Sequence, residues 1–361
     1  TDISNFRITT THRIYQEISG GINWNSVNGY YGLAKDTYPG LNPSSSGFKA
    51  VNAWTIRTAA ENNEWSSVCW SPELALFVAI SWYGANQIMT SPNGINWTSQ
   101  LQPETNFWTS ICWSPELMLF VAVATNGSNR VMISSNGTLW TRASAAQPNS
   151  WMNVCWSSEL RLFVAVSQDG ANRVMTSNDG INWRPQSEGE ANMWRSVCWS
   201  SELRLFVAVA ESGTNRVMTS NNGITWIATR AIQNNSWESV CWSKELGIFV
   251  AVSKGKEIAC VMYSSNGIVW TSVTINNNNN NNVWHSVCWS AQLDLFVAVA
   301  TTGYIMYSSN GINWTITIST LTNSINRRTD LNNLLTITGI TQSFAADVDL
   351  AQHTLIAVIG E

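Results

Sequence analysis

Charged side chains are scarce in this sequence of 361 residues. Asp, Glu, Lys and Arg together make up 12% of the chain, and the formal net charge is −4. Binding to a phosphate backbone requires a basic stripe, which this composition does not provide. We therefore expect no nucleic-acid partner.

Long apolar runs are also missing. No run approaches the roughly 18 to 20 residues that span a bilayer, and TDISNFRITT (1–10) lacks the basic start and apolar middle of a signal peptide. We expect no membrane insertion, and no signal peptide is visible.

Motifs for metal or cofactor binding are lacking as well. The three histidines, His12, His285 and His353, have no ligand-like spacing with cysteine or acid, so we expect them at surface or edge positions. The sequence contains no Gly-rich phosphate loop, no Ser-His-Asp order and no CxxC pair. We predict no metal and no cofactor.

What the sequence does contain is a repeat. The first tryptophan of each unit is Trp65, Trp108, Trp151, Trp194 or Trp237, spaced 43 residues apart, and then Trp284 after 47. A period of this length is typical of propeller blades or helical arrays. The predicted units are 65–107, 108–150, 151–193, 194–236, 237–283 and 284–318.

The pattern inside each unit favours strands. Each unit reads WxSVCWS, LFVAV, RVMTS and INWT, separated by Gly, Asn, Pro and Ser, with no helical period. LFVAV is apolar at every position, as expected for a strand buried on both faces between stacked sheets. The repeat therefore predicts four-stranded antiparallel blades around an axis, an all-β propeller.

Both ends of the chain resemble half of a blade. Residues 12–24 match a third and fourth strand, with 52–57 as the competing last strand, and 344–359 match a first and second strand. Pairing of these half-blades would close a single domain of seven blades and remove open sheet edges. Residues 25–53 and 319–342 are predicted insertions.

Six of the seven cysteines occupy one repeat position, and Cys260 is the exception. Equivalent positions lie on different blades, so the cysteines should not pair. Their Val and Trp neighbours suit small buried residues, and we expect free thiols.

The turn between the third and fourth strands recurs six times, for example as SPNGINW (91–97). It resembles the Asp-box of sialidases, sortilin-type receptors and photosystem assembly factors, in which the box is a folding device. The acidic position holds Asn93, Asn136, Asp179, Asn222, Asn266 and Asn310. Asn-Gly and Asp-Gly both suit tight turns, and a mostly neutral set favours turn structure over a calcium site.

The whole repeat is also similar to uncharacterised repeat proteins of large DNA viruses and phages. This resemblance implies a structural protein at a virion surface, or an extracellular one. The resemblance to sialidases implies a glycoside hydrolase instead, with an arginine triad and paired acids. Arg130, Arg173 and Arg216, however, recur at one repeat position, whereas a catalytic centre breaks symmetry. We therefore do not expect an enzyme.

Function should lie where the repeats differ. The loops between second and third strands are small, polar and variable, and Trp82 and Tyr83 stand out among them. These two aromatics could stack on a sugar or pack against a neighbouring loop. Arg130, Arg173 and Arg216, which end three of these loops, are further candidates for ligand binding.

The segment 25–53 fits no blade. Its aromatic and charged residues could contact another subunit or a larger assembly, or the segment could simply cover the closing blade. The candidate contact residues are Tyr30, Tyr31, Lys35, Asp36 and Tyr38.

The leading hypothesis is a non-enzymatic, lectin-like or virion-surface propeller that engages glycan or protein through the variable loops. The alternative is a structural or assembly module that uses the segment 25–53. A sialidase-like hydrolase is the third possibility.

Overall fold

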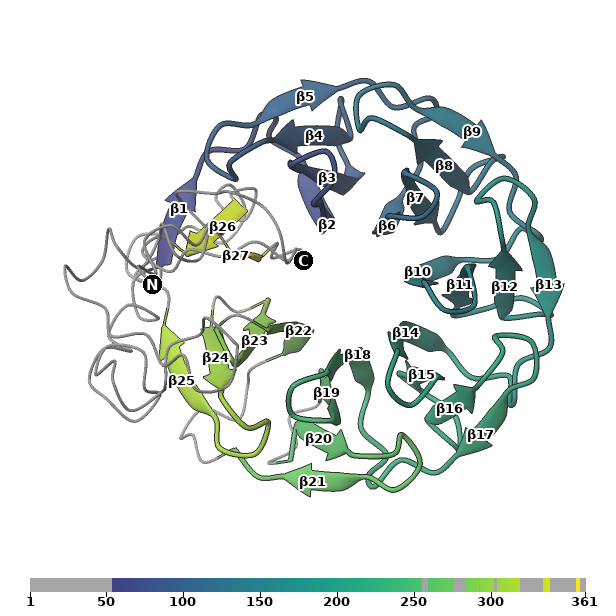
Figure 1. Cartoon of the computed structure of the whole chain (residues 1–361), viewed down its shortest axis with the longest axis vertical. Helices are drawn as coiled ribbons and strands as arrows, with labels where there is room; N and C mark the ends of the chain where they lie inside the picture. The colour runs from purple at the N-terminus through teal and green to yellow at the C-terminus, as the bar shows by residue number, and fades with distance from the viewer. Residues whose placement is uncertain are drawn as a thin grey trace, which may run out of the picture.

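A computed structural model describes residues 54–254, 259–275, 283–291, 293–301, 304–318, 334–337 and 355–357. Within these ranges every regular element is a strand, and six four-stranded antiparallel sheets stand around a central axis. The protein is a β-propeller (Figure 1). None of the described residues forms a helix long and apolar enough to cross a membrane.

Each blade runs from the inside of the ring to the outside in chain order (Figure 1). The innermost strands are β2 (Glu64–Ser71), β6 (Trp108–Ser114), β10 (Trp151–Ser157), β14 (Trp194–Ser200), β18 (Trp237–Ser243) and β22 (Trp284–Ser290). The second strands are β3 (Leu76–Tyr83), β7 (Leu119–Ala124), β11 (Leu162–Ser167), β15 (Leu205–Ala210), β19 (Ile248–Ser253) and β23 (Leu295–Ala300).

The outer half of each blade is shorter. The third strands are β4 (Ile88–Ser91), β8 (Val131–Ser134), β12 (Val174–Ser177), β16 (Val217–Ser220), β20 (Val261–Ser264) and β24 (Tyr304–Ser308). The fourth strands are β5 (Thr98–Gln100), β9 (Thr141–Ala143), β13 (Arg184–Gln186), β17 (Ile227–Thr229), β21 (Thr271–Val273) and β25 (Thr315–Ile318).

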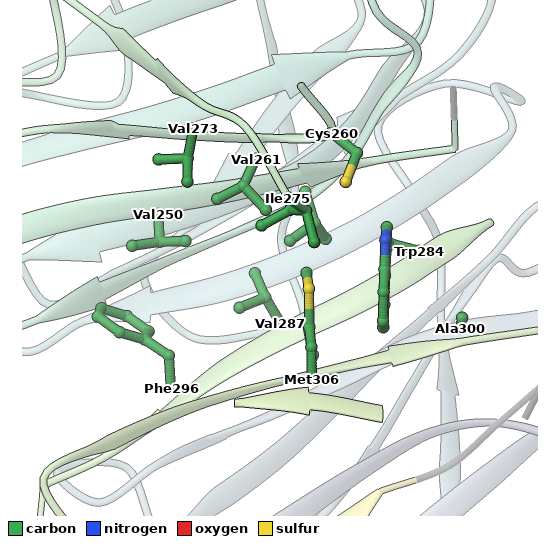
Figure 2. Close-up of a cluster of buried hydrophobic side chains, with 12 residues drawn as sticks. Val250, Cys260, Val261, Val273, Ile275, Trp284, Val287, Phe296, Ala300 and Met306 are labelled. Carbon is green, nitrogen blue, oxygen red and sulfur yellow. The ribbon is translucent and has the colours of Figure 1, made fainter. Parts of the chain in front are cut away.

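The hydrophobic core is divided into layers between neighbouring blades. In Figure 2, Val250, Val261 and Val273 of one blade face Trp284 and Phe296 of the next. The second strands are buried on both faces because each blade is covered by a neighbour on either side, as the unbroken LFVAV run predicts.

Polar contacts also join successive blades. The glutamate that follows five of the six innermost strands accepts a hydrogen bond from the second tryptophan of the next blade, as Glu159 Oε2 does from Trp199 Nε1 at 2.6 Å. The same contact joins Glu73 to Trp113, Glu116 to Trp156, Glu202 to Trp242 and Glu245 to Trp289. These repeated glutamates therefore hold the ring together.

The turns between third and fourth strands share one set of bonds. Asp179 Oδ1 accepts from the backbone N–H of Ile181 at 2.9 Å and of Asn182 at 2.8 Å, and Trp183 Nε1 donates to Gly180 O. The asparagine at the corresponding position makes the same two backbone contacts in the other turns, namely Asn93, Asn136, Asn222, Asn266 and Asn310. Asparagine thus replaces aspartate here without loss of a backbone bond.

The prediction of seven four-stranded blades is wrong. The described residues form six, and the remaining sheet has three strands, β1 (Trp54–Arg57), β26 (Leu334–Ile337) and β27 (Leu355–Ala357). The antiparallel order is β1-β26-β27, and Figure 1 places this sheet between the β2–β5 and β22–β25 blades.

The error came from aligning the chain ends with the repeat. Strand β26 lies inside 319–342, which was predicted to be an insertion, while β1 supplies the strand expected at 52–57. Residues 12–24 lie outside the described residues. The terminal segments lack the Trp-Cys-Trp pattern of a true innermost strand, so similarity in apolar spacing alone could not fix the strand count.

The seven cysteines are free, as predicted. The repeated ones pack between blades, where Cys69 contacts the layer around Trp108 and Cys112 the layer around Trp151. Burial raises the pKa of the Cys69 and Cys288 thiols to about 12, so they remain protonated and unreactive at neutral pH.

Candidate binding site at the inner rim of the loop face

The ring has two different faces. We call the face that carries the connections between second and third strands the loop face, and the opposite face, which carries the tight hairpin turns, the turn face. Because the blades are antiparallel, the first residues of each innermost strand lie on the loop face.

Repeated residues anchor the loops of this face. Asn106 Nδ2 donates to Asn129 O at 2.6 Å, and a side chain at Gly127 would collide with Asn106 Oδ1. The same asparagine and glycine pair recurs as Asn63 with Gly84, Asn149 with Gly170, and Asn192 with Gly213. The loops thus share a fixed backbone on which only some side chains vary.

The predicted ligand residues Arg130, Arg173 and Arg216 belong to this anchoring. The Arg130 guanidinium donates to the carbonyls of Thr125, Gly127 and Pro148, at 3.0, 3.2 and 2.7 Å. Arg173 and Arg216 make the equivalent three bonds on their own blades. The structure does not bring these arginines together, and a ligand role for them stays a prediction.

Trp82 and Tyr83 differ from each other in exposure. Trp82 is half-buried and stacks on Phe107 of the next blade, with ring centroids 5.0 Å apart and an interplanar angle of 19°. Tyr83 is 64% exposed. Trp82 therefore packs on a neighbouring residue, and Tyr83 is the aromatic that remains available to a partner.

The predicted contact residues of the segment 25–53 cannot be placed. Tyr30, Tyr31, Lys35, Asp36 and Tyr38 all lie outside the described residues. His12 and His353 do as well.

A site that the sequence analysis missed lies at the β-bulge near the start of each innermost strand. The pairing with the second strand skips the residue after the first tryptophan, so that residue is unpaired. The bulge residues are Ser66, Thr109, Met152, Arg195, Glu238 and His285. A bulge redirects a side chain out of the regular sheet pattern, which suits a binding position.

A second variable position lies beside each bulge. On five blades the backbone N–H of the first residue after the second strand donates to the carbonyl of the residue before the first tryptophan, as Glu211 N does to Met193 O at 2.9 Å. These five loop-start residues are Thr125, Gln168, Glu211, Lys254 and Thr301, and Trp82, near the end of β3, holds the equivalent position on the first blade. We call the bulge and loop-start residues together the inner rim.

On two blades the inner rim is neutral and simple. Thr109 Oγ1 donates to Val123 O of its own blade at 3.1 Å and to Trp151 O of the next at 2.8 Å. Ser66 makes the same pair of contacts with Ile80 O and Trp108 O. A small hydroxyl is thus sufficient to connect neighbouring blades at this position.

On the blades that begin with β14, β18 and β22 the inner rim is charged. Arg195 Nε donates to Glu211 Oε2 at 2.6 Å, and Arg195 Nη1 donates to Gln168 Oε1 at 2.9 Å. Lys254 Nζ lies 3.0 Å from Glu238 Oε1, and His285 Nδ1 lies 3.8 Å from Glu238 Oε2. We call Arg195, Glu211, Glu238, Lys254 and His285 the rim cluster.

Glu238 is the buried centre of the rim cluster, with its side chain 4% exposed. Arg195 Nε is 3.6 Å from Glu238 Oε1, and Lys254 Nζ lies 3.0 Å from the same oxygen and forms an ion pair with it. Among the described residues, His285 Nδ1 is buried without a hydrogen-bond partner. Native proteins rarely leave buried polar atoms in this state unless water or a ligand completes them.

The protonation of the cluster follows from its burial. Burial raises the pKa of Glu238 above its usual value, although Lys254 and Arg195 act against the increase. Burial, and then the positive charges of Lys254 and Arg195, lower the pKa of His285 to about 4. His285 is therefore neutral at pH 7 and can donate or accept at its ring nitrogens.

The described residues contain no group of three or more His, Cys, Asp or Glu side chains arranged to hold a metal ion. The rim cluster combines two cations with two carboxylates, so its chemistry suits polar recognition more than metal coordination.

Comparisons with known proteins support the fold. No known family and no curated protein matches this sequence. Virginiamycin B lyase from Staphylococcus aureus has a similar structure, with a TM-score of 0.63 and 10% identity over 74% of this chain and 90% of the lyase.

Two further structures are similar to this chain. YCF48 bound to D1 peptide gives a TM-score of 0.56 with 14% identity, over 73% of this chain and 84% of YCF48. The GH74 enzyme of Niastella koreensis gives 0.57 with 14% identity, over 71% of this chain and 48% of the enzyme. At these identities the likeness establishes a β-propeller repeat fold alone.

Proposed function

We propose that this protein is a non-enzymatic binding propeller that engages a glycan or protein partner through its loop face. The observation that carries the proposal is the pattern of variation on this face. Asparagine, glycine and arginine anchors recur from blade to blade, whereas the inner-rim residues range from serine to glutamate. Varied side chains on a repeated frame are typical of a recognition surface.

A binding role is preferred to catalysis for a physical reason. Glycoside hydrolysis needs two carboxylates in different environments on either side of a scissile bond. In the rim cluster, Glu211 is paired with Arg195, which leaves Glu238 as the one buried carboxylate there. The fold itself does not distinguish binding from catalysis, because propellers of similar structure include a lyase, a glycoside hydrolase and a peptide-bound protein.

Asp-box identity of the six hairpin turns is part of the proposal. The Ser-x-Asn/Asp-Gly-x-x-Trp spacing and the shared hydrogen bonds support a folding role for them. We also propose the resemblance of the repeat to proteins of large DNA viruses and phages, and with it a virion-surface or extracellular setting in which a lectin-like activity would serve attachment.

A binding screen tests the proposal. The folded protein is applied to a glycan array and to extracts of a candidate host, and bound partners are compared with those of a Trp82→Thr/Tyr83→Asn variant. This variant copies Thr125 and Asn126 of the next blade, so its loop backbone is preserved. Specific retention of a glycan or protein supports the proposal. Turnover of a glycoside across a substrate panel contradicts it.

A structural or assembly module is the second candidate, favoured by apolar side chains on the turn face. Ile181, Ile224 and Ile268 are 52%, 54% and 52% exposed at equivalent positions of successive blades. Exposed apolar groups that gather on one face are typical of contact surfaces. Self-association that is lost in an Ile181→Ser/Ile224→Ser/Ile268→Ser variant, without specific loop-face binding, would favour this candidate.

A further inference from the structure

We propose that the rim cluster is the ligand-binding site, and that it takes a neutral, hydroxyl-bearing ligand of the glycan class. This inference rests on the proposed function and assigns its location and ligand chemistry. It places recognition on the blades that begin with β14, β18 and β22, instead of on the β2–β5 blade that contains Trp82 (Figure 1).

The first step of the argument is the break in symmetry. Six blades share the same backbone bulge, and Ser66 or Thr109 fills it with a hydroxyl that satisfies two carbonyls. Arg195, Glu238 and His285 replace this self-sufficient arrangement on three consecutive blades. They introduce charges that must be compensated, so packing alone does not account for them.

The second step is the charge of the cluster. Arg195 and Lys254 carry two positive charges, Glu211 and Glu238 carry two negative charges when both are ionised, and His285 is neutral at pH 7. The balanced cluster would repel neither an anion nor a cation strongly and would attract neither. A neutral polar ligand fits it better than a phosphate, a sialylated glycan or a basic peptide.

The third step is the hydrogen-bonding capacity of the cluster. His285 Nδ1 is buried and lacks a hydrogen-bond partner among the described residues, whereas Glu238 Oε1 is paired with Lys254 Nζ. A neutral imidazole nitrogen can donate to a hydroxyl or accept from one. A hydroxyl group of a sugar can therefore bond to the His285 imidazole without adding charge.

The fourth step is access. Lys254 and His285 have side chains that are 32% and 36% exposed, so the cluster is reached from the loop face although Glu238 beneath them is buried. A ligand on the loop face can contact Lys254 and His285 directly, so both residues are expected to contribute to its affinity.

The repeat itself supplies suitable variants. An Arg195→Thr/Glu238→Thr variant removes one positive and one negative charge, and Thr can bond to Val209 O and Val252 O as Thr109 does to Val123 O. His285→Thr tests the imidazole separately. Ser66→Thr makes the same kind of change outside the cluster and serves as the matched control.

The experiment measures binding of each variant to a panel of neutral, sialylated and sulfated oligosaccharides, with thermal unfolding as a check on folding. We expect the wild-type protein and Ser66→Thr to bind the same neutral glycans with little dependence on salt. Arg195→Thr/Glu238→Thr and His285→Thr should each bind about tenfold more weakly or worse while remaining folded.

Other outcomes overturn the inference in different ways. Glycan binding that is unchanged in both cluster variants but lost in Trp82→Thr/Tyr83→Asn would refute the site and leave the proposed function intact. Binding only of charged glycans would refute the ligand class. A wild-type protein that binds a protein partner and none of the glycans would refute the inference, and one that binds neither would refute the proposed function as well.

Discussion

The neutral and charged parts of the inner rim use one backbone position in two ways. Ser66 and Thr109 bridge two carbonyls with a single hydroxyl, and no charge is buried. Arg195, Glu238 and His285 occupy the same bulge on other blades and place charged or titratable groups there, and the buried His285 Nδ1 lacks a hydrogen-bond partner among the described residues. We call the repeated strands and turns of the blades the frame. Since the frame is the same on all six blades, the charged residues are not needed to build a blade. Substitutions in the frame and at the inner rim should therefore have separable effects.

The largest effect is expected from the frame. Gly223 has a φ of +72°, and an added Cβ would lie 2.7 Å from Leu162 Cδ2 and 3.1 Å from Val164 Cγ2 of the preceding blade. Gly223→Ala should lower the free energy of unfolding by about 3 kcal/mol, through backbone strain and overpacking. Urea denaturation at pH 7 measures the change.

Gly247→Ala is the matched control for this substitution. Gly247 has a φ of +65° and no atom within 4 Å of the added Cβ. Its counterparts on other blades are Ala75, Met118, Arg161, Arg204 and Asp294, all with positive φ. We expect a loss of about 1 kcal/mol or less. If Gly223→Ala and Gly247→Ala lowered the free energy of unfolding equally, the close contact of Gly223 with the preceding blade would make no contribution to the cost of the substitution.

The frame is also the part that the sequence predicts well. The 43-residue spacing of Trp108, Trp151 and Trp194 marks the start of successive innermost strands, and the apolar LFVAV run correctly indicates burial on both faces. The tryptophan spacing and the apolar run are strong signals because they recur in every blade, where the same strands pack against the same neighbours. The sheet of β1, β26 and β27 lacks the repeated pattern, and its strand number was predicted wrongly.

The rim could not be predicted in the same way. The bulge residue is the variable x in the repeat pattern WxSVCWS, and this variability is the feature of the sequence that could have indicated the inner rim. The variability alone does not reveal that Arg195 contacts the loop-start residues Gln168 and Glu211, which lie 27 residues before it and 16 after it. Such contacts depend on the ring geometry and not on the local pattern. From the sequence alone the asymmetry is visible chiefly at Trp82, a tryptophan outside the repeated positions.

A smaller loss of stability is expected from breaking the rim cluster. Glu238→Gln removes the carboxylate that Lys254 and Arg195 approach at 3.0 and 3.6 Å. The two cations are only partly exposed, so we expect a loss of about 2 kcal/mol in the free energy of unfolding at pH 7. Arg195→Thr/Glu238→Thr should cost less than Glu238→Gln, because it preserves the charge balance. The reverse order in urea denaturation would contradict the account of the cluster.

The charged and neutral parts of the inner rim should also differ in how they make stability depend on pH. The pKa of His285 is lowered from 6.5 to about 4 on folding, so the unfolded chain binds more protons between these values. Stability from this group is complete above pH 6.5 and is lost as pH falls towards 4. The raised pKa of Glu238 acts in the opposite direction from pH 4.5 upward, so it opposes the effect of His285 in part of the same range.

His285→Thr should therefore flatten the fall in Tm between pH 6.5 and pH 4. Ser66→Thr, at the equivalent neutral position, should leave the slope unchanged. Thermal unfolding followed by circular dichroism across this range measures both. A slope that is the same in His285→Thr and the wild type would show that the pKa of His285 is not lowered on folding.

The smallest effect is expected at the one acidic turn, Asp179. Burial alone would raise its pKa, but hydrogen bonds from Asn182 and the N–H of Ile181 outweigh burial and lower the pKa from 3.8 to about 2. Asp179→Asn should change the free energy of unfolding at pH 7 by less than about 0.5 kcal/mol, because asparagine makes the same backbone contacts in the other five turns.

In acid, the stabilities of the wild-type protein and Asp179→Asn should diverge. A depressed carboxyl pKa contributes stability that is present above 3.8 and lost as pH falls through 2, and asparagine does not titrate. Urea denaturation at pH 7 and in the acid range should therefore give similar midpoints at pH 7 and a smaller acid loss for Asp179→Asn. A large loss already at pH 7 would mean that the charge of Asp179 has a role that the asparagine turns do not share.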